Sequence, residues 1–181
     1  MKHFERSSGC VIRAEARQDV QSIWRVHQAA FGGVVEPDLV NALRDEGLVE
    51  VSLVAEIGDQ IVGHILFSSV SIITDSGSFQ AASLAPMAVM PHYQRHGIGG
   101  RLVLAGLDAC RAKGHGIAVV LGHPKFYARC GFSAELAKPL QSPFGGGEAW
   151  MAVELAAGAL AGVEGKVEYP AAFGVFVRRE G

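Results

Sequence analysis

Two periodicities of apolar residues divide the first half of the chain into helices and strands. Apolar positions recur every three or four residues after Asp19, which is a suitable helix N-cap, and this pattern stops at Gly32. A second helix is expected over residues 37–44, where Pro37 suits a first helical turn. Short β-rich runs predict strands over residues 11–16, 51–57, 60–73 and 79–90.

The last three of these strands are expected to form two hairpins, with an irregularity in the third strand. Gly58-Asp59 separates the first pair, and a turn at residues 75–77 separates the second pair. Pro86 lies inside the third strand, and proline has no N–H group to donate to a strand ladder. We therefore expect a bulge or a loss of pairing at Pro86.

The second half of the chain alternates between helical and strand patterns. A helix is expected over residues 97–113, and the wholly apolar run at 117–121 is typical of a buried parallel strand. The other expected elements are a short helix over 124–130 and strands over 132–134 and 149–155. This order, with one β-α-β crossover, predicts an α/β fold with a mixed central sheet of about six or seven strands flanked by about four helices. Because no repeat or linker is apparent, we expect a single domain over residues 1–181, with a core at about 11–155 and a C-terminal extension over 156–181.

Charge and hydropathy narrow the class of protein. The 16 basic and 18 acidic side chains give a net charge of -2, which offers no positive surface for nucleic acid or an anionic membrane. No apolar run approaches the roughly 18 residues of a membrane span, and the polar N-terminus does not resemble a signal peptide. Three widely spaced cysteines without a CxxC pair favour free thiols in the reducing cytoplasm. No tight cluster of metal-ligating side chains is apparent, so no metal is expected.

Glycine is the compositional outlier, and its distribution draws attention to one strand-to-helix turn. The chain has 23 glycines, which is about twice the usual share of about 7%. The turn consists of Gln94, Arg95, His96, Gly97, Ile98, Gly99, Gly100 and Arg101. Glycines let a backbone approach a ligand, and the free N–H groups and dipole of a helix N-terminus favour an anion such as pyrophosphate. Arg95, His96 and Arg101 would add positive charge, although the same glycines also suit an ordinary helix start.

Two known phosphate-binding loops do not fit this turn. A dinucleotide fingerprint requires G-x-G-x-x-G, and Leu102 stands where the third glycine is needed. The P-loop pattern G-x-x-x-x-G-K-[ST] occurs nowhere in the chain. These mismatches argue against most nucleotide-dependent NTPases.

Three motifs in order resemble the GNAT family of N-acetyltransferases. Residues 94–101 match the family's Gln/Arg-x-x-Gly-x-Gly/Ala pattern for acetyl-coenzyme A (acetyl-CoA). Residues 84–89 resemble the preceding strand, and residues 122–132 resemble a later motif with an aromatic pair before Gly-Phe. Both are close to the YhbS-like bacterial branch, and the similarity extends from about Val11 to Phe176.

The resemblance implies how acetyl-CoA is bound. The central strand would splay from its parallel neighbour, and the pantetheine arm would insert beside it like a further strand. Backbone N–H groups near the disturbed strand would polarise the thioester carbonyl, and these belong to Met87, Ala88 and Val89. Residues 94–101 would bind the pyrophosphate.

Tyr127 is the candidate for protonating the leaving thiolate. A phenol has a pKa near 10, so it can protonate a thiolate whose conjugate acid has a pKa near 8.5. The family places its general-acid tyrosine four residues before the glycine that corresponds to Gly131. From the residues alone a packed core aromatic is the commoner interpretation, and the resemblance favours the catalytic one.

No residue is assigned as general base with the same clarity. Many family members have a Glu on the central strand where this chain has Ser83, which is a poor base. Glu36 is a candidate because the first two helices usually line the acceptor side in this family, although acidic residues are common in a first helical turn for structural reasons. A water chain, an amine that arrives neutral, His92 and His123 are the alternatives.

Two functions from different classes stay open at this point. The first is an N-acetyltransferase that transfers the acetyl group of acetyl-CoA to a primary amine of a small molecule or protein by direct attack in a ternary complex. The second is a non-catalytic acyl-CoA-binding sensor or interaction module, which the missing strand carboxylate suggests and Tyr127 disfavours. The acceptor side is expected to involve the glycines at 145–147. Members of this family are often dimers, so the resemblance also leaves a homodimer open.

Overall fold

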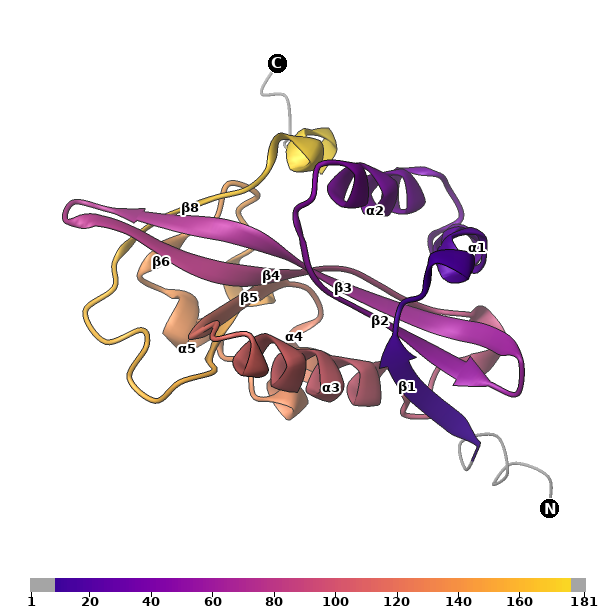
Figure 1. The fold of residues 1–181 in the computed structure, drawn as a ribbon. Helices are drawn as coiled ribbons and strands as arrows, with labels where there is room; N and C mark the ends of the chain where they lie inside the picture. The colour runs from indigo at the N-terminus through magenta and orange to yellow at the C-terminus, as the bar shows by residue number, and fades with distance from the viewer. Residues whose placement is uncertain (1–8, 177–181) are drawn as a thin grey trace.

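A twisted mixed sheet runs through the centre of the molecule in the computed structural model, which describes residues 9–176 (Figure 1). Its strands are β1 (Cys10–Ala14), β2 (Val49–Ile57), β3 (Gln60–Thr74), β4 (Gly77–Val89), β5 (Ile117–Leu121), β6 (Leu140–Gln141), β7 (Trp150–Glu154) and β8 (Gly165–Glu168). The order along the sheet is β1-β2-β3-β4-β5-β7, and β8 pairs with both β3 and β6. Only the β4–β5 and β6–β8 pairs are parallel within the described part of the chain. The predicted mixed α/β fold is therefore confirmed.

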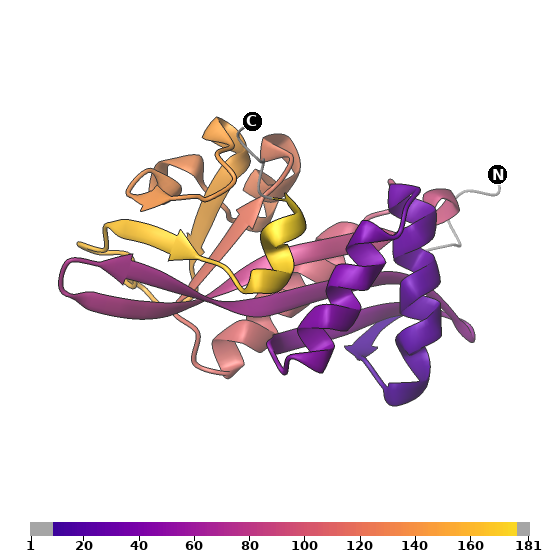
Figure 2. The same ribbon diagram turned by 90° about the horizontal axis from the view of Figure 1, so that it is seen from above.

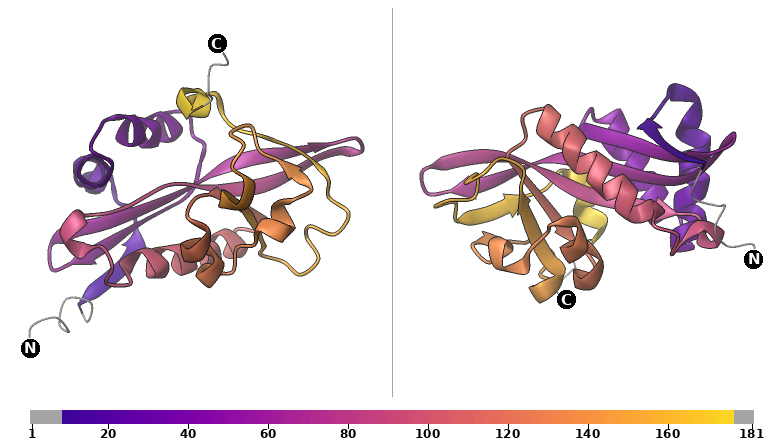
Figure 3. Two further views of the ribbon diagram at one scale, coloured as in Figure 1. Left: turned by 180° about the vertical axis from the view of Figure 1, so that it is seen from behind. Right: turned by 90° about the horizontal axis from the view of Figure 1, so that it is seen from below.

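Helices cover both faces of this sheet. α1 (Val20–Phe31) and α2 (Val35–Asp45) lie on one face, and α3 (Ile98–Ala112) lies on the other (Figures 1 and 2). Figure 3 shows α3 crossing the strands when the molecule is seen from below. The short helices are α4 (Pro124–Tyr127) and α5 (Ala134–Ala137), and the 3-10 turns are η1 (Arg17–Asp19), η2 (Pro91–Tyr93), η3 (Ala128–Cys130), η4 (Gly147–Ala149) and η5 (Ala171–Phe176).

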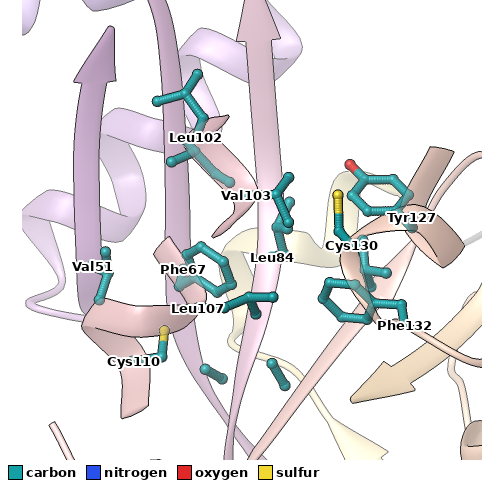
Figure 4. Packing of buried hydrophobic residues seen from close by; sticks show 14 of the residues in the cluster. Val51, Phe67, Leu84, Leu102, Val103, Leu107, Cys110, Tyr127, Cys130 and Phe132 are labelled. Carbon is teal, nitrogen blue, oxygen red and sulfur yellow. The ribbon is translucent and has the colours of Figure 1, made fainter. Parts of the chain in front are cut away.

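Because both faces of the sheet are covered, β3 is apolar on both sides. Ile65 and Phe67 belong to the buried cluster beneath α3, whereas Leu66 belongs to the cluster beneath α1 and α2. This alternation follows from the two-residue period of a strand. Figure 4 shows Phe67 beside Leu107 of α3, in the cluster that also holds Leu84 and Leu102.

The face beneath α1 also contains a buried polar network. His27 Nε2 lies 2.8 Å from His64 Nδ1, and both side chains are fully buried. His64 Nε2 lies 2.8 Å from Ser52 Oγ, which donates to Glu15. Arg44 Nε donates to the same carboxylate at 2.9 Å. Burial lowers the pKa of His27 to about 3 and also lowers that of His64, so the pair is neutral at pH 7.

The predicted irregularity at Pro86 is confirmed. β4 pairs with β5 only from Ala82 to Leu84, and its register with β3 shifts by one residue between Leu84 and Met87. After Leu84 the two parallel strands separate, because the proline and the bulge end the ladder on that side. This separation opens the centre of the sheet.

Two local predictions were wrong, and one strand was not predicted. Residues 132–134 do not form a strand: Ser133 makes one isolated bridge with Ala152, and α5 begins at the next residue. Asp19 does not cap α1, because its carboxylate accepts from the Ala16 N–H group at 2.7 Å and pairs with Arg13 at 2.6 Å. The C-terminal extension forms β8, a strand that the apolar pattern did not predict.

Within residues 9–176 the structure contains neither a membrane-spanning helix nor a cluster of metal ligands. No helix between residues 9 and 176 is both long and apolar enough to span a membrane. Over the same stretch, no group of three or more His, Cys, Asp and Glu side chains is placed to hold a metal ion.

Candidate active site

A cavity of about 1300 Å³ lies where β4 and β5 separate, and it is lined from both faces of the sheet. Its floor comes from residues 83–89 of β4. On the α3 side, which we call the glycine half, the lining consists of Gln94, Arg95, Gly97, Gly99, Gly100, Leu104, Leu121, Gly122, His123, Phe126, Tyr127, Arg129 and Cys130. On the α1 and α2 side, which we call the aromatic half, it consists of Ala30, Phe31, Glu36, Leu39, Phe144, Tyr169, Phe173 and Phe176.

The N-terminus of α3 presents unused N–H groups to the glycine half. Gly97 is the N-cap residue with φ 81°, a left-handed conformation that favours glycine. The first intrahelical bond runs from the Arg101 N–H group to the Gly97 carbonyl at 3.1 Å. The N–H groups of the three residues between them precede that bond and therefore have no acceptor within the helix. This is a fitting site for the phosphate groups of a ligand.

The structure brings only part of the predicted anion site to the cavity. Gln94, Arg95 and the three glycines line it, and Gln94 Nε2 donates to the Val89 carbonyl at 2.9 Å. Three predicted members do not line the cavity: Ile98 is buried in the core, Arg101 donates to the Cys10 carbonyl at 2.9 Å, and His96 Nδ1 donates to the Gln94 carbonyl at 2.7 Å. The motif spacing did not reveal Arg129, which supplies a positive charge from η3.

Two of the three predicted carbonyl-polarising N–H groups face the gap between β4 and β5. The Met90 N–H group donates to Val62 of β3 at 2.8 Å. Because N–H groups alternate sides along a strand, that of Ala88 also points to β3, whereas those of Met87 and Val89 point away from it. β5 no longer pairs with β4 at this position, so both N–H groups are left for a ligand. The assignment of Ala88 is corrected on this ground.

Tyr127 is held rigidly in the glycine half. Its ring packs edge-on against Phe126 and Phe132, with ring centroids 4.9 Å and 5.7 Å away. A Cβ atom at Gly122 would come within 2.3 Å of this ring, so the close approach requires glycine there. Figure 4 shows the hydroxyl pointing away from Phe132, beside the sulfur of Cys130. Burial, together with Cys130, raises the pKa of Tyr127 to about 12, so the phenol holds its proton at neutral pH.

A pair of hydroxyl groups lies at the floor of the cavity, and it includes Ser83, the position at which the sequence resemblance implies a carboxylate in many family members. Ser83 Oγ donates to Tyr169 Oη at 2.9 Å, and both residues line the cavity. Burial raises the pKa of Tyr169, so its hydroxyl is also protonated at pH 7. Tyr169 follows β8, and the sequence contained no pattern that would have predicted its contact with Ser83, 86 residues earlier.

Among the base candidates, the structure places Glu36 and His123 at the cavity. Glu36 lies in the first turn of α2 and is the one acidic residue among the described residues that line it. None of the salt bridges within residues 9–176 involves Glu36. His92 lies in η2 and does not line the cavity.

The chain is similar to several acetyltransferases over most of its length. A family model described as an acetyltransferase (GNAT) domain matches residues 11–134. Over 168 residues the chain is 34% identical to YhbS of Escherichia coli K12, described as an uncharacterized N-acetyltransferase, and this match covers 92% of the chain and 99% of YhbS.

Solved structures agree with this assignment. The crystal structure of E. coli YhbS in complex with CoA matches with a TM-score of 0.85 and 32% identity, covering 95% of this chain and 96% of that one. A GNAT family acetyltransferase from Brucella melitensis in complex with acetyl-CoA matches with a TM-score of 0.75 and 33% identity, covering 91% and 97%. With the splayed strand and the glycine turn in place, the fold and these likenesses lead to one conclusion: the chain belongs to the GNAT family of N-acetyltransferases.

Proposed function

We propose that the protein transfers the acetyl group of acetyl-CoA to a primary amine by direct attack in a ternary complex. The observation that supports this most strongly is a single cavity that crosses the sheet, because it lets two substrates meet from opposite faces. Similar proteins have been solved with bound CoA and acetyl-CoA, and the unused N–H groups at the start of α3 favour the glycine half as the site of the cosubstrate. The aromatic half is then the acceptor side.

The residues of the glycine half fit acetyl-CoA. The free N–H groups at the start of α3 and the side chains of Arg95 and Arg129 suit the phosphates. A Cβ atom at Gly99 would lie 3.4 Å from Phe126 and 3.7 Å from Met87, so a larger residue there would narrow the channel beside β4. The Met87 and Val89 N–H groups would hold the pantetheine arm and the thioester carbonyl in line with the strand.

The reaction then requires one proton to be given and one to be removed. The amine nitrogen attacks the carbonyl carbon while N–H groups of β4 stabilise the charge that develops on the oxygen. As the carbon–sulfur bond breaks, Tyr127 donates its proton to the departing sulfur. The amine loses one proton, so the products are an amide and a free thiol. Glu36, His123 or water is the acceptor of that proton.

The cellular setting stays a prediction. Cys10, Cys110 and Cys130 are buried free thiols, which supports a reducing compartment such as the cytoplasm. We retain the homodimer as an expectation from the family.

A screen of primary amines with acetyl-CoA tests this proposal. We expect free thiol to appear together with the acetylated amine for at least one amine. Tight binding of acetyl-CoA without thiol release for any amine would contradict the proposal and favour the non-catalytic binding module.

A further inference from the structure

The aromatic half contains a packed group of rings that the proposed chemistry does not use. Tyr169 lies edge-on to Phe144 and Phe173, with centroids 4.8 Å and 4.9 Å away. Phe173 also lies 6.4 Å from Phe176. The rings come from the loop before β7 and from the C-terminal tail, and Phe31 adds another ring from the end of α1.

Part of this group is open to solvent, whereas Phe173 is only 3% exposed. Phe31 is 47% exposed and Phe176 is 38% exposed, although both line the cavity. An apolar lining that continues to the surface is a feature of sites that bind an apolar ligand. Phenyl faces also attract flat rings and cations, because the face of the ring is its electron-rich side.

Charge is segregated within the cavity. The positive side chains Arg95 and Arg129 lie in the glycine half, whereas Glu36 lies in the aromatic half as the cavity's carboxylate. Leu39, one helical turn after Glu36, belongs to the same buried cluster as Phe173, and α2 contacts η5, so the helix that carries Glu36 packs beside the ring group. A cation on an apolar body matches this arrangement.

Building on the proposed function, we propose that the acceptor is an arylalkyl primary amine without a carboxylate. Its ring packs against Phe144, Tyr169 and Phe173, and Glu36 binds its ammonium group. Before attack the ammonium passes one proton to Glu36 or to water. The neutral nitrogen then forms the amide bond and loses a second proton to His123 or to water, while Tyr127 protonates the departing sulfur.

The residues that line the aromatic half disfavour two other classes of acceptor, amino acids and peptides. An amino acid would place its carboxylate near Glu36 with no cation of the aromatic half to receive it. A peptide would need partners for its backbone N–H and carbonyl groups. The hydroxyls here, those of Ser83 and Tyr169, leave only the Tyr169 O–H as a free donor, because the Ser83 hydroxyl donates to Tyr169.

Comparison of 2-phenylethylamine with phenylalanine tests the proposal directly, because they differ by one carboxylate. We expect kcat/KM to be at least about 10-fold higher for 2-phenylethylamine, as one repulsive charge contact implies. Glu36→Gln should raise the KM for 2-phenylethylamine about 10-fold and change kcat less. Phe144→Leu should raise KM by about threefold through the loss of ring contacts.

Two controls are matched to these variants. Asp38→Asn removes the same charge from an exposed site in the same first turn of α2, and Phe79→Leu removes an exposed ring from β4. Both should leave KM unchanged. Equal kcat/KM values for the two amines would overturn the assignment of the acceptor class while leaving the acetyltransferase function intact.

An unreactive probe separates failure of this inference from failure of the proposed function. Phenethyltrimethylammonium has the ring and the positive charge but no proton to lose, so calorimetry with CoA-loaded protein measures binding alone. We expect saturable binding that weakens about 10-fold in Glu36→Gln. If no amine is acetylated, such binding still supports the acceptor class, whereas no binding overturns it.

Discussion

The two halves of the cavity are built from different parts of the polypeptide. The glycine half and the adjoining floor offer backbone N–H groups from one contiguous stretch, residues 87–100. The aromatic half uses side chains from α1, α2, the loop before β7 and the tail. Backbone groups bind phosphates and a thioester in any sequence that folds this way, whereas side chains can be fitted to one acceptor.

The supports beneath the two halves differ as well. α3 rests on apolar side chains such as Phe67, whereas beneath α1 the apolar contacts are joined by a polar network that links His27 of α1 to His64, Ser52 and Glu15. A dry apolar contact is insensitive to pH, whereas a buried histidine pair must stay neutral. The aromatic half is therefore the half that acid should affect first.

Gly97→Glu should give the largest effect and should act on the glycine half alone. It adds a carboxylate at the anion site and forces a non-glycine residue to φ 81°, so acetyl-CoA affinity should fall by at least about 100-fold. Gly114→Glu is the matched control, because Gly114 has φ 89° after the other end of α3 and open space around it. Equal affinities in the two variants, measured by calorimetry, would remove the phosphate assignment.

Tyr127→Phe should separate chemistry from binding within the same half. We expect kcat to fall by about 100-fold, a typical contribution of a general acid, while the Kd for acetyl-CoA changes less than about twofold. Because the pKa of Tyr127 is raised to about 12, the wild-type rate should show no loss from phenol ionisation up to about pH 11. Tyr93→Phe is the control, since that hydroxyl donates to Gln60 at the surface. An unchanged kcat in Tyr127→Phe would exclude this residue as the acid.

Mild acid should loosen the aromatic half before the glycine half. The pKa of His27 is about 3 in the folded state and about 6.5 when unfolded, so between these values the unfolded chain binds the extra proton. The unfolding free energy should thus fall as the pH drops below 6.5, by up to about 1.4 kcal/mol per pH unit for this histidine.

Denaturant unfolding and amide hydrogen exchange at pH 7.5, 6 and 5 measure this effect. α1 should lose protection before α3, and His27→Phe should flatten the pH dependence, whereas His92→Gln at an exposed position should not. If α3 lost protection before α1, the packing beneath α1 would not be the more acid-sensitive of the two.

Tyr169→Phe should give the smallest effect and should be confined to the aromatic half. It removes the acceptor of the Ser83 hydroxyl, so the unfolding free energy should fall by about 1 kcal/mol with no change in acetyl-CoA affinity. A double-mutant cycle with Ser83→Ala should show a coupling of similar size. Additive losses would mean that the hydroxyl pair does not act as a unit.

The glycine half is easier to predict from the sequence than the aromatic half, because its residues are close together along the chain. Glycines at fixed spacing and a proline in a strand are local signals, so the turn at 94–101 and the break at Pro86 could be predicted. The directions of the Ile98, Arg101 and His96 side chains could not, because they depend on where the helix packs. The pairing of Ser83 with Tyr169 depends on a strand that joins the sheet from the tail, and no local pattern encodes such a contact.

The tail that forms β8 and η5 lies outside the β4-α3-β5 unit that would hold the cosubstrate. Substitutions in this tail can reshape the acceptor wall without touching the glycine turn or Tyr127. Substitutions confined to one short terminal segment could therefore change which amine fits the cavity and leave the cosubstrate site as it is.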